Sequence, residues 1–269
     1  MIAESYSLVP NLQKVVLQAY DQYGTPVASP GFDIYANTAN NLFQAYLAVR
    51  DRDLKPIVQS DLDAFKAEAK SASAETAARS YIKQCLERSH NESILFDRIF
   101  SIDPQYSVDP KSAFASIRTY QRSLVTGVNI SPIATNLQSI LQSADLQTIC
   151  NVLGWITNEY LLLDYDDEET PFTTHCRAVA ARLLSEHLWT FTDATFEAEI
   201  ARSIIKAPVS PESLKIGPVS SGVASSNASP PVKKALELLV LFDRAMPKER
   251  CVSVSDMPTL SSLLSVLVV

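Results

Sequence analysis

Glycine, histidine and strict apolar–polar alternation are all scarce in this 269-residue chain, and each shortage narrows what the protein can be. With 6 glycines and few alternating stretches, a strand-rich fold is disfavoured, while apolar residues recur mainly at helical spacing. Only three histidines are present, and no GxSxG, P-loop, GxGxxG or HExxH pattern occurs. The sequence therefore predicts an all-α, non-enzymatic protein with no cofactor.

The chain also lacks paired cysteines and long apolar runs. Its 4 cysteines lie far apart without a CxxC pair, as expected of reduced, mostly buried thiols in a reducing compartment. The first residues, MIAESYSLVPNLQK, show no basic region followed by an apolar one, and no apolar run approaches the roughly 20 residues that span a bilayer. We therefore expect a cytoplasmic protein that neither enters nor crosses a membrane.

The net charge limits the kinds of partner that the protein can bind, and the length limits the size of its core. A net charge of -7 and a pI near 5.0 oppose a uniform footprint for nucleic acid, although a local basic groove is compatible with that total. With 46% hydrophobic residues, 269 residues suffice for one large domain or two small ones. A soluble globular protein is expected.

The first third of the chain predicts helices separated by a Pro/Gly loop. Apolar stripes occur near residues 8–19 and 42–49, with the loop GTPVASPGF between them. Ser60 resembles an N-cap, with Asp63 three positions later, and would open an Ala-rich helix that reaches about Leu86.

In the middle of the chain one start signal occurs three times, each time as a capping residue followed by proline: Asp109-Pro110, Ser131-Pro132 and Thr170-Pro171. The capping oxygen accepts from an unpaired N–H, and proline at the first helical position gives up a donor that would be unpaired anyway. Thr192 is a further predicted N-cap. The short connections favour antiparallel packing, and the unequal intervals favour a bundle over a solenoid.

The whole pattern predicts a bundle of about eight to ten helices. Residues 1–206 would form the helical core, in one piece or as two lobes of about 1–105 and 106–206. Residues 207–231, rich in Pro, Ser and Gly, read as a linker or extended arm, and residues 232–269 as a terminal helix with an apolar tail. We expect this arm to dock on the protein's own core or on a neighbouring subunit, through Val232, Leu236, Leu239, Val240, Leu263, Leu264, Val266 and Leu267.

An acidic run, LLLDYDDEETPF, contains five carboxylates at 164–169 and admits two interpretations. Asp166, Asp167 and their neighbours resemble the aspartate-rich motif of class I terpene synthases, which implies a Mg²⁺-dependent enzyme, but no second metal-binding motif follows downstream. The favoured interpretation is an exposed turn whose last acids face the positive N-terminal end of the next helix. No metal ligand is therefore assigned.

The histidines and basic clusters are weaker signals. His175 and Cys176 are adjacent without a ligand partner one turn away, His187 is interpreted as a helix-packing residue, and His90 as a surface residue near a helix start. Tyr120 stands between Arg118 and Arg122 in the sequence, where a nucleic-acid base could stack. The simpler interpretation is that these arginines lie on the polar, solvent-facing sides of amphipathic helices.

These observations favour a structural or assembly protein that acts by protein–protein association, as a homo-oligomer. Two alternatives remain open at this point. One is a nucleoprotein or viral coat-like subunit that packages nucleic acid through Arg118, Tyr120 and Arg122; the other is a Mg²⁺-dependent enzyme that uses the acids at 164–169.

Overall fold

The computed structural model describes residues 8–28, 30–102, 112–162, 169–206 and 230–245. Within these ranges the regular elements are helices, and one isolated β-bridge joins Tyr20 to Pro26, which confirms the all-α prediction. The elements are α2 (Val9–Ala19), α3 (Phe32–Ser71), α4 (Ala74–Phe100), α5 (Ala113–Leu124), α6 (Ile130–Leu141), α7 (Leu146–Ile156), η1 (Thr157–Leu161), α8 (Pro171–Leu183), η2 (Leu184–Leu188), α9 (Trp189–Ile200), η3 (Ala201–Ile205) and α10 (Pro230–Ala245).

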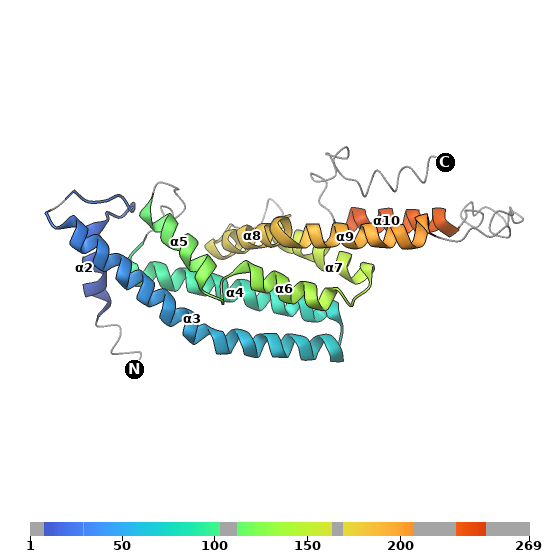
Figure 1. The fold of residues 1–269 in the computed structure, drawn as a ribbon, viewed down its shortest axis with the longest axis horizontal. Coiled ribbons are helices and arrows are strands. Elements are labelled where there is room, and N and C mark those ends of the chain that lie inside the picture. Colours follow the sequence, from blue (N-terminus) through green and yellow to red (C-terminus); the bar gives the residue numbers. More distant parts are fainter. Residues whose placement is uncertain (1–7, 29, 103–111, 163–168, 207–229, 246–269) are drawn as a thin grey trace, which may run out of the picture.

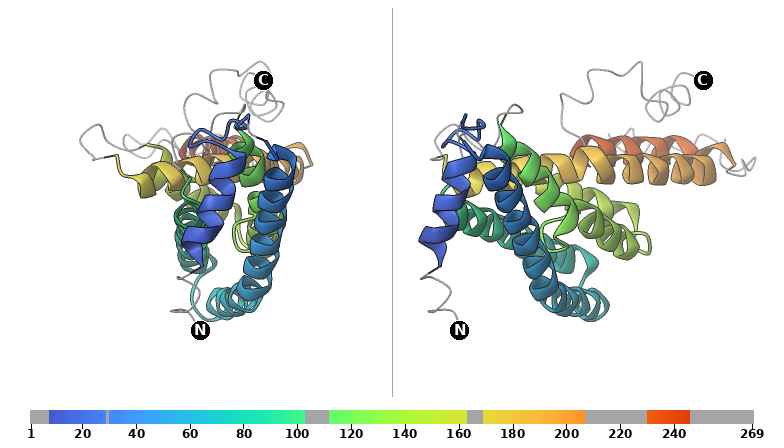
Figure 2. Two further views of the ribbon diagram at one scale, coloured as in Figure 1. Left: turned by 90° about the vertical axis from the view of Figure 1, so that its left-hand side faces the viewer. Right: turned by 60° about the vertical axis from the view of Figure 1, so that its left-hand side comes forward.

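Helix α4 is the centre of an elongated bundle (Figures 1 and 2). It packs against α2, α3, α6, α7 and α8. Helices α8 and α9 are joined through the π-helical turn η2 into one long run along the bundle, continued by η3. Helix α10 lies alongside the far end of this run and packs on α7 and η3 (Figure 1).

Helix α3 corrects the first predicted helix start. It is continuous over 40 residues, so Ser60 lies inside a helix and is not an N-cap. Pro56 lies inside α3 and removes one backbone hydrogen bond, which bends a helix more readily than it ends it when both halves are packed. Figure 1 shows α3 curving along the bundle. The cap falls at Ser73, whose side chain accepts from the Thr76 N–H at 3.1 Å and opens α4.

The proline-marked starts have different outcomes. Thr170 caps α8 as predicted: its hydroxyl accepts from the Thr173 N–H at 3.1 Å, and the Thr173 hydroxyl accepts from the Thr170 N–H at 2.9 Å. Ser131 is not the cap of α6. Asn129 takes that position, because its side-chain oxygen accepts from the Ser131 N–H at 3.0 Å, which leaves Pro132 within the first turn.

Two further starts also differ from expectation. Asp109 lies outside the described residues, and α5 opens after Ser112, whose side chain accepts from the Phe114 N–H at 3.2 Å. Thr192 was predicted wrongly as an N-cap, since it is fully buried inside α9. Its hydroxyl donates at 2.8 Å to the carbonyl of Leu188, one turn back, so the side chain is satisfied without ending the helix.

The buried apolar residues form two clusters that share α3 and α4. One contains Leu54 of α3 and Phe96 of α4, together with residues of α2 and α5. The other contains Phe65 of α3 and Leu86 of α4, together with residues of α6 to α10. Both clusters are therefore tied to the same two long helices.

Three arginine–carboxylate pairs hold α3, α4 and α5 together. Arg50 of α3 donates two hydrogen bonds to Glu92 of α4, at 2.9 and 2.6 Å. Arg88 of α4 pairs with Asp61 of α3, and Arg118 of α5 pairs with Asp97 of α4. The residues of the last pair are the more deeply buried, with 4% of Arg118 and 8% of Asp97 exposed.

Candidate interaction surfaces

Helix α10 presents one face to the core and another to solvent. Ala235, Leu238, Phe242 and Ala245 are buried, and the Phe242 ring meets Phe196 edge-on, with their centroids 5.3 Å apart. At Gly154 of α7 an added Cβ would lie 2.7 Å from the Arg244 carbonyl oxygen, so the two helices approach closely because this position has no side chain. The inner face of α10 is thus part of the core.

The outer face of α10 contains two of the eight residues that the sequence marked for interaction. Leu236 and Val240, one turn apart, are 49% and 52% exposed. Val232 and Leu239 are half-buried on the same helix. The other predicted interaction residues, Leu263, Leu264, Val266 and Leu267, lie outside the described residues, as do nearly all of residues 207–231.

A groove of about 1270 Å³ runs beside this outer face. Its walls come from α10, the α9–η3 segment and the beginning of α7, and Leu236, Val240 and Leu241 supply apolar lining. Charges of both signs surround it, including Lys234, which lies 3.3 Å from Glu237 and 4.0 Å from Glu199. We call Leu236, Val240 and this groove the α10 surface.

A second groove, of about 700 Å³, lies between α3 and α5. Phe43, Leu47 and Ile117 form its floor, and the exposed side chains of Tyr120 and Leu124 stand at its edge, 63% and 56% accessible. The amphipathic pattern of α5 did not reveal this groove, because its opposite wall comes from a helix about 70 residues earlier in the chain.

The three residues considered for nucleic-acid contact occupy different environments. Arg118 is buried, paired with Asp97, and placed over the Phe96 ring at 4.7 Å. Tyr120 borders the α3–α5 groove, and Arg122 is exposed at the end of α5. Arg118 is therefore engaged in holding α5 to α4, since its guanidinium also donates to the Ser93 carbonyl of α4 at 3.2 Å.

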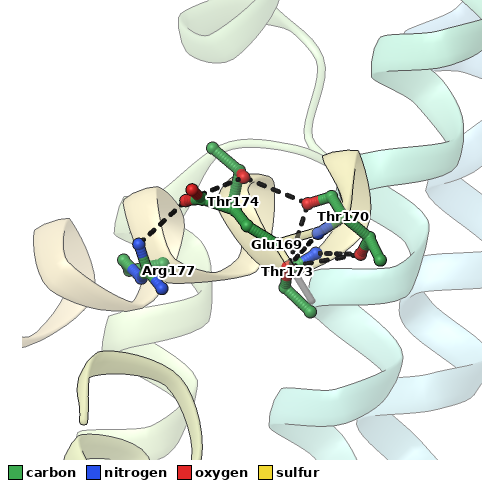
Figure 3. A network of polar contacts seen from close by, with 5 residues as sticks. All are labelled: Glu169, Thr170, Thr173, Thr174 and Arg177. Atoms are coloured by element: carbon green, nitrogen blue, oxygen red, sulfur yellow. Dashed lines mark hydrogen bonds and ion pairs between the residues drawn. The ribbon is translucent and has the colours of Figure 1, made fainter. Parts of the chain in front are cut away.

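Of the five carboxylates in the acidic run, only that of Glu169 falls within the described residues. Figure 3 shows its carboxylate over the first turns of α8, where it accepts from the Thr174 hydroxyl at 3.3 Å and from Arg177 at 3.0 Å. This is where an acid interacts favourably with the positive end of a helix. The remaining acids, Asp164, Asp166, Asp167 and Glu168, lie outside the described residues.

The histidines include a pair that sequence spacing could not show. His90 lies inside α4, not at a helix start, and its ring meets His175 of α8 at 5.3 Å between centroids. A ring nitrogen of His175 lies 3.0 Å from the Ser89 hydroxyl. Burial, followed by the charges of His90, Arg122 and Arg118, lowers the pKa of His175 to about 4. His187 lies half-buried in η2.

The described cysteines are buried free thiols, which agrees with their interpretation as core residues. Burial raises the pKa of Cys85 and Cys150 to about 12 and that of Cys176 to about 11. Cys251 lies outside the described residues. Among described residues, no group of three His, Cys, Asp or Glu side chains could hold a metal ion. Of the helices in the described ranges, none combines the length and apolarity needed to cross a bilayer.

Comparison with known proteins identifies one family. The family model described as "Conserved oligomeric Golgi complex subunit 3, C-terminal" matches residues 3–256, nearly the whole chain. Neither a curated protein nor a solved structure matches.

Proposed function

The chain belongs to the family of conserved oligomeric Golgi complex subunit 3, C-terminal, and from this premise we propose that it is a non-enzymatic helical subunit of such a complex. It acts by protein–protein association, and its partners are other subunits. A numbered subunit implies neighbours of different sequence, so the homo-oligomer expected from the sequence gives way to a heteromeric assembly. The family description also points to a location at the Golgi complex.

The α10 surface is the observation that carries this proposal. Its two half-exposed apolar side chains, Leu236 and Val240, repeat at the one-turn spacing that an amphipathic helix of a partner matches. They border a groove already walled by α7, α9 and η3, so a partner helix would pack against prepared surfaces on more than one side. The surrounding charges of both signs, such as Lys234 and Glu237, would set the orientation of the partner.

The C-terminal residues extend the same proposal. The inner face of α10 packs on the protein's own core, which leaves the outer face for a neighbour. The apolar positions Leu263, Leu264, Val266 and Leu267 follow α10 in sequence, and we include them in the same contact.

The test is co-expression of the full chain with the other subunits of the complex, followed by affinity purification and light scattering. Leu236→Asp with Val240→Asp should abolish recovery of at least one subunit, because two charges would be buried in the contact. Ile57→Asp is the matched control, since Ile57 is 51% exposed on α3, away from the α10 surface. Thermal unfolding should be unchanged in both variants.

If the Leu236/Val240 variant assembles as the wild type does, the α10 surface is not the contact. If the wild-type chain recovers no other subunit and light scattering gives a homo-oligomer, the heteromeric role itself is wrong. A high 260/280 absorbance ratio in the purified sample would instead support the nucleoprotein alternative.

A further inference from the structure

Two arginines from different helices share a small pocket at the junction of α5, α6 and α8. The pocket measures about 430 Å³ and is lined by Thr119, Arg122, Ser123, Asn129, Ser131 and Arg182, with Ile130 as the apolar member. Its volume lies within the range of small-molecule sites, roughly 300–1,000 Å³.

Among the residues that the structure describes, the lining of this pocket contains cations and neutral polar groups and no carboxylate. A cavity of about 100 Å³ adjoins it through Arg122, Ile130 and Arg182, and adds Arg118, His175 and Ser89. Its lining, too, has no carboxylate within the described part of the chain. In a chain of net charge -7, this concentration of positive charge is local and specific.

Arg122 differs from the other two arginines at this junction in its side-chain partners. Of the arginines at this junction, Arg118 pairs with Asp97, and Arg182 donates to Glu186 at 2.8 and 3.2 Å. Within the described part of the chain, no ion pair or hydrogen bond is formed by the Arg122 side chain. Arg122 is open to solvent on one side, but its partial burial and the nearby charge of Arg182 both lower its pKa, so the fold holds two like charges together at a cost. The same positive potential contributes to the lowered pKa of His175.

The two guanidinium groups and Ser131 suit an anion with several oxygens. The Ser131 hydroxyl can donate, and a guanidinium offers two parallel donors to a phosphate. The hydroxyls of Thr119 and Ser123 donate to the carbonyls of Ala115 and Tyr120, each at 3.0 Å, and contribute polar lining. Ser131 also stands in the first turn of α6, where the helix dipole favours negative charge. Arginine is better suited than lysine to such forked recognition.

We propose that the pocket of Arg122 and Arg182 binds a phosphate monoester group, carried by a small phosphorylated molecule or by a lipid headgroup. This site lies apart from the α10 surface and does not depend on the proposed association. Bound phosphate would relieve the repulsion between the two guanidinium groups.

The test uses the full chain and three probes: inositol trisphosphate, phosphatidylcholine vesicles with and without phosphatidylinositol bisphosphate, and a single-stranded oligonucleotide. Calorimetry and vesicle sedimentation at fixed salt should show saturable binding of inositol trisphosphate, of the phosphoinositide vesicles, or of both. Binding of the free molecule alone assigns a soluble ligand, and stronger binding of the vesicles assigns a lipid headgroup.

Arg122→Gln should weaken binding at least tenfold. Arg202→Gln is the matched control, because Arg202 is an exposed arginine paired with Glu199 on another part of the molecule, and binding should change less than twofold. Arg122→Gln should also keep or raise the unfolding temperature without ligand, since it removes a repulsion. Arg182→Lys retains the positive charge but loses the two parallel N–H donors of the guanidinium. It should weaken binding while the fold stays intact.

The proposal is overturned if no probe binds saturably, or if Arg122→Gln and Arg202→Gln weaken binding equally. Tighter binding of the oligonucleotide than of inositol trisphosphate would also overturn it, in favour of a nucleic-acid backbone as the ligand.

Discussion

Arg118 of α5 and Asp97 of α4 form an ion pair in the interior of the bundle, with 4% and 8% of the residues exposed. The Arg118 guanidinium also donates to the Ser93 carbonyl at 3.2 Å and to the Gln121 side chain at 2.8 Å. The pair therefore fixes α5 against α4 through several directed bonds. An arginine that looks like a surface cation in the sequence is a structural element of the fold.

Asp97→Asn should strongly destabilise the protein, because it leaves the Arg118 charge buried without its partner. Loss of one member of a buried pair costs about 3–5 kcal/mol. Urea unfolding would measure this, with Asp53→Asn as the control, since Asp53 pairs with Arg52 on the surface and should contribute less than about 1 kcal/mol.

Replacing both members with apolar residues should recover most of the loss. Arg118→Met with Asp97→Leu removes both charges together, so no uncompensated charge is left behind. A double variant as unstable as Asp97→Asn would show that the hydrogen bonds around the pair, not the buried charge, dominate.

Gly154→Ala should lower stability, although alanine is the better helix former by about 0.5–1 kcal/mol. The added Cβ would lie 2.7 Å from the Arg244 carbonyl oxygen and would push α10 away from α7. We expect a net loss of about 1–3 kcal/mol by chemical unfolding, in the range of overpacked cores. A gain in stability would mean that α10 does not approach α7 this closely in solution.

His175 should make the protein less stable as pH falls from about 6.5 toward 4. Burial, followed by nearby positive charges, lowers its pKa from 6.5 to about 4 in the folded state. Between these values the unfolded chain binds a proton that the folded chain does not, so stability is present above pH 6.5 and is lost on acidification, by about 1–3 kcal/mol.

The measurement is the unfolding free energy across this pH range in wild type, His175→Gln and His187→Gln. His175→Gln should flatten the pH dependence relative to wild type, whereas His187→Gln should retain it. Equal slopes for wild type and His175→Gln would contradict the assignment.

Thr170→Ala should destabilise α8 by about 0.5–2 kcal/mol, the usual effect of losing an N-cap. The Thr170 hydroxyl accepts from the Thr173 N–H at 3.1 Å, and this bond would be lost. Thr190→Ala is the matched control, because Thr190 is an exposed residue within α9 and is not an N-cap. This change should be neutral or slightly stabilising, since alanine is the better helix former. Thermal unfolding of both variants would test this, and similar shifts would argue against the capping role.

Sequence patterns predicted individual helices better than their ends. Apolar periodicity located the helices around 8–19, 130–153 and 232–245, because the 3.6-residue period reflects which side is buried. Ser60 and Thr192 are capping residue types, yet both lie inside helices: packing of α3 on α4 continues past Ser60, and the Thr192 hydroxyl is satisfied by the Leu188 carbonyl. Local capping preferences of about 1 kcal/mol are outweighed where long helices pack.

The candidate sites, like the helices, could be predicted from the sequence only in part. Leu236 and Val240 were marked from apolar spacing, but which face of α10 turns outward depends on Gly154 admitting the helix to α7. The sharing of one pocket by Arg122 and Arg182 has no sequence signal, because 60 positions separate them and neither belongs to a motif.

By itself, then, the sequence determined the helical class, the buried thiols and the Thr170 cap, all of which follow from short-range periodicity, composition or hydrogen bonding between close neighbours. Only the tertiary structure decided that Arg118 is buried, that α10 leaves one apolar face accessible, and that two arginines meet at one pocket. These features depend on contacts between segments far apart in the chain, where the environment of a side chain is set by helices that its own sequence neighbourhood does not contain.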